Sequence, residues 1–218
     1  MKKALIVGYG SIGTRHLKNL ISIENMKILI LTKRKNLEIN QKNVKVIHNL
    51  KDALNEKPDF ALITNETRYH IPIALKLAKF GLDLFIEKPL SDSMKNIEKL
   101  KKIVNEKKLV TQIGCNLRFY PPLKKIKELV GKQIVGKPIS VQVETGSYLP
   151  DWHPWEDYRT GYAAKKELGG GVLLTAIHEI DYLYWIFGKI TDVSSITGKF
   201  SDLEVNADDL SVSLIKFK

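Results

Sequence analysis

The sequence predicts an α/β protein in two parts, a doubly wound parallel sheet followed by a smaller α+β domain. Three observations lead to this prediction. A four-residue apolar run at residues 4–7 leads directly into Gly-x-Gly-x-x-Gly and a helical pattern. Short apolar runs then alternate with helical patterns as far as about residue 118. Beyond that point the alternation stops, so we expect one domain over residues 1–118 and a second over residues 119–218.

Composition limits the class of protein. Of the 218 residues, 44% are hydrophobic and 27% charged, which is typical of a folded globular chain. The formal net charge is +11, but the lysines are spread over helical surfaces, so we expect no nucleic-acid partner. The single cysteine, Cys115, excludes an internal disulfide, and we expect no metal site. No apolar run is long enough to span a membrane, and the Met-Lys-Lys start leads into a strand; we therefore expect a cytoplasmic protein without membrane contact.

The glycine motif predicts a dinucleotide site. Gly8 permits a tight turn after the strand, Gly10 lets the backbone approach a pyrophosphate, and Gly13 lets the helix pack closely on the sheet. The N–H groups of Ser11 and Ile12, in the first turn of the helix, would face the phosphates. The alternative is a strand-to-helix turn with no ligand.

The order of elements predicts a sheet edge at which ligand-binding groups gather. Helical patterns separate apolar strands, and this order requires parallel pairing with helical crossovers. Ligands of such sheets lie beyond the carboxyl ends of the strands, where Thr32, Asn65 and Glu87 are expected. The strands are expected at residues 27–32, 44–47, 59–64, 83–86 and 109–114.

The end of the second strand distinguishes two cofactors. NAD-binding folds usually carry Asp or Glu there, whereas this chain has Thr32, Lys33, Arg34 and Lys35. Hydroxyl, ammonium and guanidinium groups bind a 2′-phosphate that a carboxylate would repel. The sequence therefore favours NADP over NAD, the alternative being a solvated basic loop.

The tripeptide Glu87-Lys88-Pro89 follows the strand at residues 83–86 and so lies at the cofactor edge. Proline fixes the backbone there and aims Lys88 into the cleft. Partial desolvation beside a cationic nicotinamide would make the Lys88 amine a usable proton donor or acceptor. The alternative is an ordinary surface lysine.

Six segments together resemble the glucose–fructose oxidoreductase / inositol dehydrogenase (Gfo/Idh/MocA) family: residues 4–16, 64–70, 87–90, 114–119, 169–171 and 178–181. The resemblance implies an N-terminal Rossmann domain and a C-terminal domain with an open, mostly antiparallel sheet. It also implies hydride exchange between a nicotinamide and a sugar or polyol carbinol. Lys88 and His178 are the implied catalytic residues. The implied cofactor contacts beyond the glycine turn and the basic loop are Asn65, His70, Glu87, Lys88 and Asn116.

The second domain is expected to supply the substrate site. Arg118 follows the sixth strand and would face substrate, unless it is a hydrogen-bonded strand end. The loop-like segment at residues 146–168 is rich in aromatics, and Trp152 and Tyr158 suit stacking against a sugar ring. This segment resembles relatives from surface-polysaccharide and sialic-acid-like sugar pathways, which indicates a sugar or nucleotide-sugar substrate. A packed loop or a subunit contact is the alternative.

Residues 172–187 read as one apolar, buried helix. Thr175, His178 and Asp181 recur at intervals of three and would share a face of this helix, so we expect all three to line the substrate site. A satisfied core histidine is the alternative for His178.

Two features depart from the family pattern. An acidic residue usually stands about one turn before the catalytic histidine, where this chain has Leu174 and Thr175. Relatives are also longer, whereas here only residues 139–145, 193–200 and 210–217 read as strands of the second sheet. An unpaired edge would be covered in a homo-oligomer, or the chain is a fragment of a longer product. A dinucleotide- and sugar-binding protein without turnover is therefore the alternative function.

Overall fold

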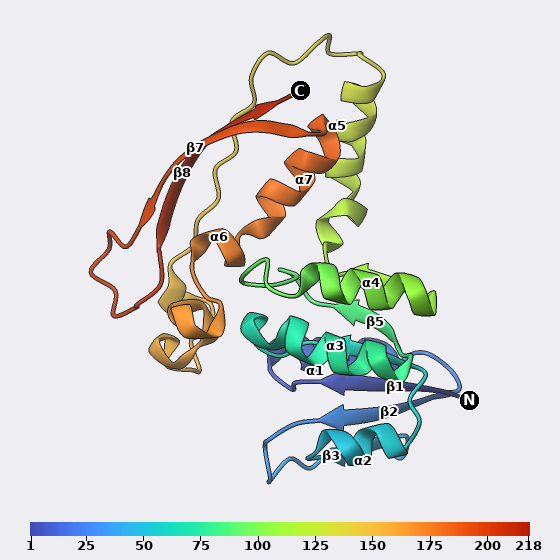
Figure 1. The fold of residues 1–218 in the computed structure, drawn as a ribbon. Helices are drawn as coiled ribbons and strands as arrows, with labels where there is room; N and C mark the ends of the chain where they lie inside the picture. Colours follow the sequence, from blue (N-terminus) through green and yellow to red (C-terminus); the bar gives the residue numbers. More distant parts are fainter. The chain divides into compact units, whose positions relative to one another are not determined.

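The computed structural model describes residues 1–218, and contacts within the chain divide it into two compact units, Met1–Gly114 and Cys115–Lys218. The first unit contains a six-stranded parallel sheet in the order β3-β2-β1-β4-β5-β6 (Figure 1). The order reverses between β1 and β4, which creates a switch point at the carboxyl ends of these two strands. The strands are β1 (Lys2–Val7), β2 (Met26–Leu31), β3 (Val44–Ile47), β4 (Phe60–Ile63), β5 (Asp83–Ile86) and β6 (Thr111–Ile113). The predicted doubly wound sheet is confirmed.

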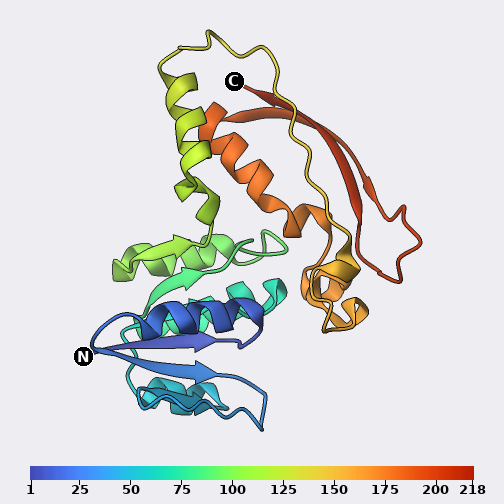
Figure 2. The same cartoon turned by 180° about the vertical axis from the view of Figure 1, so that it is seen from behind.

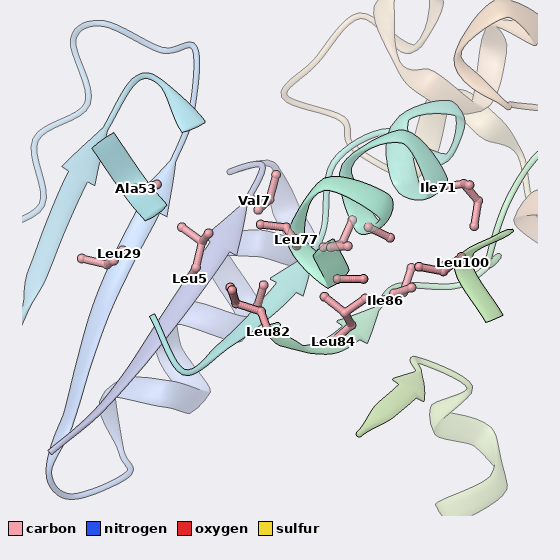
Figure 3. Close-up of a cluster of buried hydrophobic side chains, with 14 of the residues drawn as sticks. Leu5, Val7, Leu29, Ala53, Ile71, Leu77, Leu82, Leu84, Ile86 and Leu100 are labelled. Atoms are coloured by element: carbon pink, nitrogen blue, oxygen red, sulfur yellow. The ribbon is translucent and has the colours of Figure 1, made fainter. Parts of the chain in front are cut away.

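Helices cover both faces of this sheet. On one face, α1 (Ser11–Ile21) packs Leu17 and Leu20 against alternate residues of β1 and β2. The other face is covered by α2 (Leu50–Asn55), α3 (His70–Phe80) and α4 (Ile97–Lys107). Figure 3 shows this second core, in which Leu5 and Ile86 of the strands meet Leu77 of α3. Because both faces are buried, the strands read as continuous apolar runs rather than as alternating ones.

The second unit contains three α-helices, five short 3-10 helices and a β-hairpin (Figure 2). The α-helices are α5 (Pro121–Gly131), α6 (Val172–Thr175) and α7 (Ile177–Phe187). The strands β7 (Ile190–Gly198) and β8 (Leu210–Phe217) pair antiparallel, and Phe187 at the end of α7 contacts Phe217 with ring centroids 5.6 Å apart. No helix in either unit combines the length and the apolar character that crossing a membrane requires.

Two local predictions for the second unit are wrong. Residues 139–145 form no strand, although their apolar residues alternate; Ile139 is fully exposed, and the strands of the hairpin pair only with each other. Residues 172–187 are not one buried helix but two half-buried ones, interrupted at Ala176. The Thr175 hydroxyl donates to the Gly171 carbonyl at 2.9 Å, a side-chain bond of the kind that bends helices.

Candidate functional site

The carboxyl ends of β1 and β4 lie side by side and form the centre of the candidate site, because Val7 pairs with Ile63. Gly8 has φ +94°, and a Cβ at this position would lie 2.7 Å from the Asn65 Cα atom, so only glycine fits. The buried Thr64 hydroxyl donates to the Gly8 carbonyl at 2.9 Å and fixes the turn. Sequence reasoning gave Thr64 no role.

The glycine turn opens onto the first turn of α1. A Cβ at Gly13 would lie 2.5 Å from the Gly8 carbonyl oxygen, whereas nothing lies within 4 Å of a Cβ built on Gly10. Gly10 is extended and provides no side-chain cap, and Ser11 is exposed. The first N–H groups of a helix lack intrahelical acceptors, so those of Ser11, Ile12 and Gly13 form an open anion site.

Asn65 provides an independent sign of a ligand. Its carboxamide oxygen Oδ1 is buried and has no hydrogen-bond partner. A buried acceptor without a partner costs free energy that a bound donor would recover. The unpartnered oxygen and the uncapped helix start lie at one sheet edge, and together they fit a dinucleotide.

The residues after β2 carry positive charge. Lys33, Arg34 and Lys35 are exposed and form no ion pair. Thr32 is buried; its hydroxyl accepts a hydrogen bond from the Arg34 backbone N–H at 3.2 Å, and its carbonyl accepts one from the His48 Nδ1 atom at 3.0 Å. These hydrogen bonds of Thr32 therefore help to fix the conformation of the loop that carries the Lys33, Arg34 and Lys35 side chains.

The segment Glu87–Pro89 follows β5, next to β4 in the sheet, and its Lys88–Pro89 peptide bond is cis. The Glu87 Oε1 atom lies 2.6 Å from the His16 Nε2 atom, and the Lys88 backbone N–H donates to Oε2 at 3.2 Å. The Pro89 carbonyl accepts from the Nδ1 atom of His70, which is 1% exposed. Sequence reasoning assigned His16 no role. A polar residue one turn after Gly13, on the buried side of α1, nevertheless indicates that its side chain has a hydrogen-bond partner.

In the second unit, two predicted substrate residues bond to each other. The Arg118 Nε atom donates to Asp181 Oδ2 at 2.9 Å, and Nη2 donates to Oδ1 at 2.6 Å. These hydrogen bonds raise the pKa of Arg118, with burial opposing the shift. Asp181 and His178 lie on α7, whereas Thr175 lies on α6, across the interruption. Asn116 is exposed and begins the short 3-10 helix Asn116–Phe119, which also carries Arg118.

The aromatic segment is anchored to the loop between β7 and β8. The Tyr158 hydroxyl accepts from the Glu204 backbone N–H at 3.2 Å, and Arg159 forms an ion pair with Glu204 at 2.9 Å. Trp152 donates its indole N–H to the Ser147 hydroxyl and keeps 40% of its surface exposed. The Tyr158 hydroxyl is therefore engaged in a hydrogen bond within the unit, whereas the ring of Trp152 is partly accessible to solvent.

Comparisons with known proteins agree with this architecture. Residues 2–115 match the family model described as an oxidoreductase family with an NAD-binding Rossmann fold (GFO_IDH_MocA), and residues 123–218 match the GFO/IDH/MocA C-terminal domain. The chain is 26% identical to myo-inositol 2-dehydrogenase of Thermotoga maritima, over 98% of this chain and 64% of that protein. It is 28% identical to the oxidoreductase YrbE of Bacillus subtilis, over 86% of this chain and 54% of that protein.

Solved structures share the fold. WlbA dehydrogenase from Bordetella pertussis, in complex with NADH and UDP-GlcNAcA, superposes with a TM-score of 0.79 at 17% identity, covering all of this chain and 68% of that one. Myo-inositol 2-dehydrogenase from Lactobacillus plantarum gives a TM-score of 0.79 at 21% identity, covering 99% and 66%. The chain thus spans roughly half to two thirds of the length of the curated relatives. It belongs to the GFO/IDH/MocA family of oxidoreductases, whose N-terminal domain is an NAD-binding Rossmann fold.

Proposed function

We propose that this chain is an NAD(P)-dependent oxidoreductase that acts on a carbinol carbon of a sugar, polyol or nucleotide-sugar. One observation carries the proposal: the open glycine turn, the unpartnered Asn65 oxygen and the Glu87–Pro89 segment all lie at the carboxyl edge of one sheet. The substrate class is supported by relatives, since one is named for myo-inositol and another binds UDP-GlcNAcA in its structure.

The cofactor would be held by groups that the fold leaves available. The N–H groups of Ser11 and Ile12 would bind the pyrophosphate, and Gly10 would allow its close approach. Asn65 would accept a hydrogen bond at the nicotinamide end of the site. A bound nicotinamide supplies one half of the chemistry, since it gives or takes the hydride.

Lys88 and His178 are proposed to handle the proton. As a carbonyl is reduced, the Lys88 ammonium would donate a proton to the developing alkoxide; in the reverse direction the amine would accept the hydroxyl proton. His178 would exchange that proton with solvent or hold the substrate hydroxyl. Arg118 is already committed to Asp181 and would offer substrate its outer N–H groups.

NADP is proposed over NAD because of the loop after β2. Lys33 and Arg34 are exposed cations without ion pairs, and no carboxylate follows the strand directly. A 2′-phosphate would gain charge-assisted hydrogen bonds from these side chains.

Thr175 favours a second candidate function, a protein that binds cofactor and sugar without turnover. It stands near the position at which the family resemblance implies an acidic residue, and its hydroxyl donates to the Gly171 and Val172 carbonyls at 2.9 and 3.2 Å. A neutral threonine does not raise the basicity of His178 as a carboxylate would.

Replacement of Lys88 tests the proposal. Lys88→Ala should lower kcat on a responsive polyol or nucleotide-sugar by about 10²–10⁴ while the Kd for reduced cofactor stays near the wild-type value. The matched control is Lys99→Ala, which removes an exposed lysine on α4 and should change neither quantity. Full turnover in Lys88→Ala would contradict the catalytic role. Tight cofactor and sugar binding with no turnover on any substrate would favour the second candidate.

Self-association through the β7–β8 sheet completes the proposal. On one face of the hairpin the hydroxyl groups of neighbouring strands hydrogen-bond in pairs, Ser195 with Ser213 and Thr197 with Ser211. The opposite face exposes Ile196, Val212 and Leu214, the last of which is 77% exposed. Exposed apolar side chains on a short two-stranded sheet are typical of an interface. Light scattering of the purified chain measures whether it forms dimers or larger assemblies.

A further inference from the structure

We propose that His16 and His70 are positioning residues for Lys88, acting from helices on opposite faces of the sheet. His16 fixes the residue before Lys88, and His70 fixes the residue after it. This inference rests on the proposed function, because it assumes that Lys88 takes part in the chemistry. Neither histidine needs to touch cofactor or substrate for this role.

His16 holds Glu87. The two side chains are 15% and 13% exposed, and the Nε2 atom of His16 lies 2.6 Å from the Glu87 Oε1 atom. The ring of His16 also contacts the ring of Phe85 edge-on, with centroids 5.1 Å apart, so its orientation is set by β5 as well as by α1. A half-buried charge-assisted bond of this kind is short and directional.

Glu87 in turn holds the backbone of Lys88. Its second oxygen, Oε2, accepts the Lys88 N–H at 3.2 Å, so one carboxylate connects His16 with the peptide that leads into Lys88. The space beside the carboxylate is closed by the end of β6, because a Cβ at Gly114 would lie 2.9 Å from Oε2. The carboxylate is therefore packed against the backbone of Gly114 on this side.

His70 holds the other side. Its Nδ1 atom lies 2.9 Å from the Pro89 carbonyl oxygen, and its Nε2 atom lies 2.9 Å from the Asn65 carbonyl oxygen. Both carbonyls can only accept hydrogen bonds, so the ring donates to the carbonyl that faces its protonated nitrogen, and the tautomer decides which one that is. Asn65 is packed against Gly8, and the same ring therefore connects the Lys88 segment with the glycine turn.

The two-sided contact of His70 allows its bonds to be tested separately. The amide nitrogen of Asn stands about where Nδ1 of histidine does, and that of Gln reaches about as far as Nε2. His70→Asn should keep the bond to Pro89 and lose the bond to Asn65, while His70→Gln should do the reverse. His16→Gln keeps a donor for Glu87, whereas His16→Ala removes it.

Three measurements are made on each full-length variant: kcat with a responsive substrate, the Kd for reduced cofactor, and the rate at which trace acetic anhydride acetylates Lys88, read by mass spectrometry on the cofactor-free protein. His16→Ala and His70→Gln should lower kcat by about tenfold to a hundredfold and change the acetylation rate of Lys88. His16→Gln should stay near wild type in all three. His70→Asn should weaken cofactor binding more than it lowers kcat.

Asn43→Ala is the matched control. It removes one side-chain bond to a backbone carbonyl, from Asn43 to Met26 at 3.1 Å, at the amino end of β2. It should leave kcat and the acetylation of Lys88 unchanged. Should the buried His70 variants fail to fold, His16→Ala, which lies nearer the surface, decides the question.

Wild-type kcat and wild-type acetylation of Lys88 in folded His16→Ala would overturn the inference. That result is distinct from failure of the proposed function, in which Lys88→Ala itself keeps full turnover. An inactive Lys88→Ala beside a fully active His16→Ala would leave the function standing and remove the positioning role.

Discussion

Arg118 and Asp181 form a two-bonded ion pair across 63 positions of sequence, with nitrogen–oxygen distances of 2.9 and 2.6 Å. The pair ties the short 3-10 helix Asn116–Phe119 to α7, the helix that carries His178. A fork of two parallel bonds fixes orientation as well as distance. The orientation of α7 in the second unit therefore depends on a residue that the sequence alone suggested as a substrate contact.

Loss of the Arg118 fork should destabilise the second unit. Arg118→Lys keeps the charge but cannot form both bonds, and we expect a loss of about 1–2 kcal/mol, since the Arg118 side chain is 38% exposed. All three tryptophans lie in the second unit, so their fluorescence during urea unfolding reports on it directly. Additive effects in a double-mutant cycle of Arg118→Ala and Asp181→Ala would contradict a direct coupling.

Two glycines of the turn should respond to alanine in opposite ways. Gly13→Ala places a Cβ 2.5 Å from the Gly8 carbonyl oxygen and should lower stability by about 1–3 kcal/mol. Gly10→Ala meets no atom within 4 Å and should leave stability close to wild type, while its methyl group blocks the approach of a pyrophosphate. Thermal unfolding and fluorescence titration with reduced cofactor separate the two effects. Unchanged cofactor affinity in Gly10→Ala would argue against a phosphate at this turn.

Arg34 should contribute to cofactor preference. Arg34→Ala removes an exposed guanidinium without an ion pair and should weaken NADPH binding by about tenfold, which corresponds to one charge-assisted hydrogen bond, while NADH binding changes little. Lys42→Ala, which removes another exposed cation further along the same connection, is the control. Equal losses for both cofactors would instead indicate a general electrostatic effect.

Asp209 should make the loop between β7 and β8 sensitive to acid. Burial raises the pKa of its carboxyl, but hydrogen bonds from the Ser201 hydroxyl and the Phe200 and Ser201 N–H groups outweigh burial and hold the pKa below its usual 3.8. A carboxyl with a lowered pKa stabilises the fold above its unfolded-state pKa, and that contribution is lost as the pH falls through the folded-state value.

The loop should therefore loosen below about pH 3.8. Hydrogen exchange of the Phe200 and Ser201 amides between neutral and acid pH measures this. Asp209→Asn should remove the acid-dependent step at these two amides. Persistence of the step in Asp209→Asn would assign it to another group.

The first unit could be predicted from sequence because its signals are local. The apolar run before Gly8 predicts a buried strand, and the order of strand, turn and helix fixes the topology. His16 received no role, because its partner Glu87 lies 71 residues away and no local pattern pairs them. The sequence suggested His70 as a cofactor contact, which stays a prediction; it did not indicate that the two ring nitrogens would each lie 2.9 Å from a backbone carbonyl oxygen, of Pro89 and of Asn65.

The second unit was harder to predict because its apolar patterns form a strand or a continuous helix only where other parts of the chain provide matching contacts. Alternating apolar residues at 139–145 satisfy the pattern of a strand, but a strand exists only where another edge accepts its hydrogen bonds, and none does so here. Likewise, the apolar run at 172–187 does not reveal that the Thr175 hydroxyl would bond within the chain and that the helix would be interrupted at Ala176. Whether Lys88 and His178 act on one substrate stays a prediction.

The bare backbone at Gly114 has a practical consequence for engineering. Gly114 is the last residue of the first compact unit, and the Glu87 carboxylate occupies the space that a side chain at this position would fill. A chimaera that exchanges the second unit and is joined after codon 114 keeps this glycine. A donor sequence with a larger residue at this position would require the Glu87 carboxylate to shift, and Glu87 directly precedes Lys88.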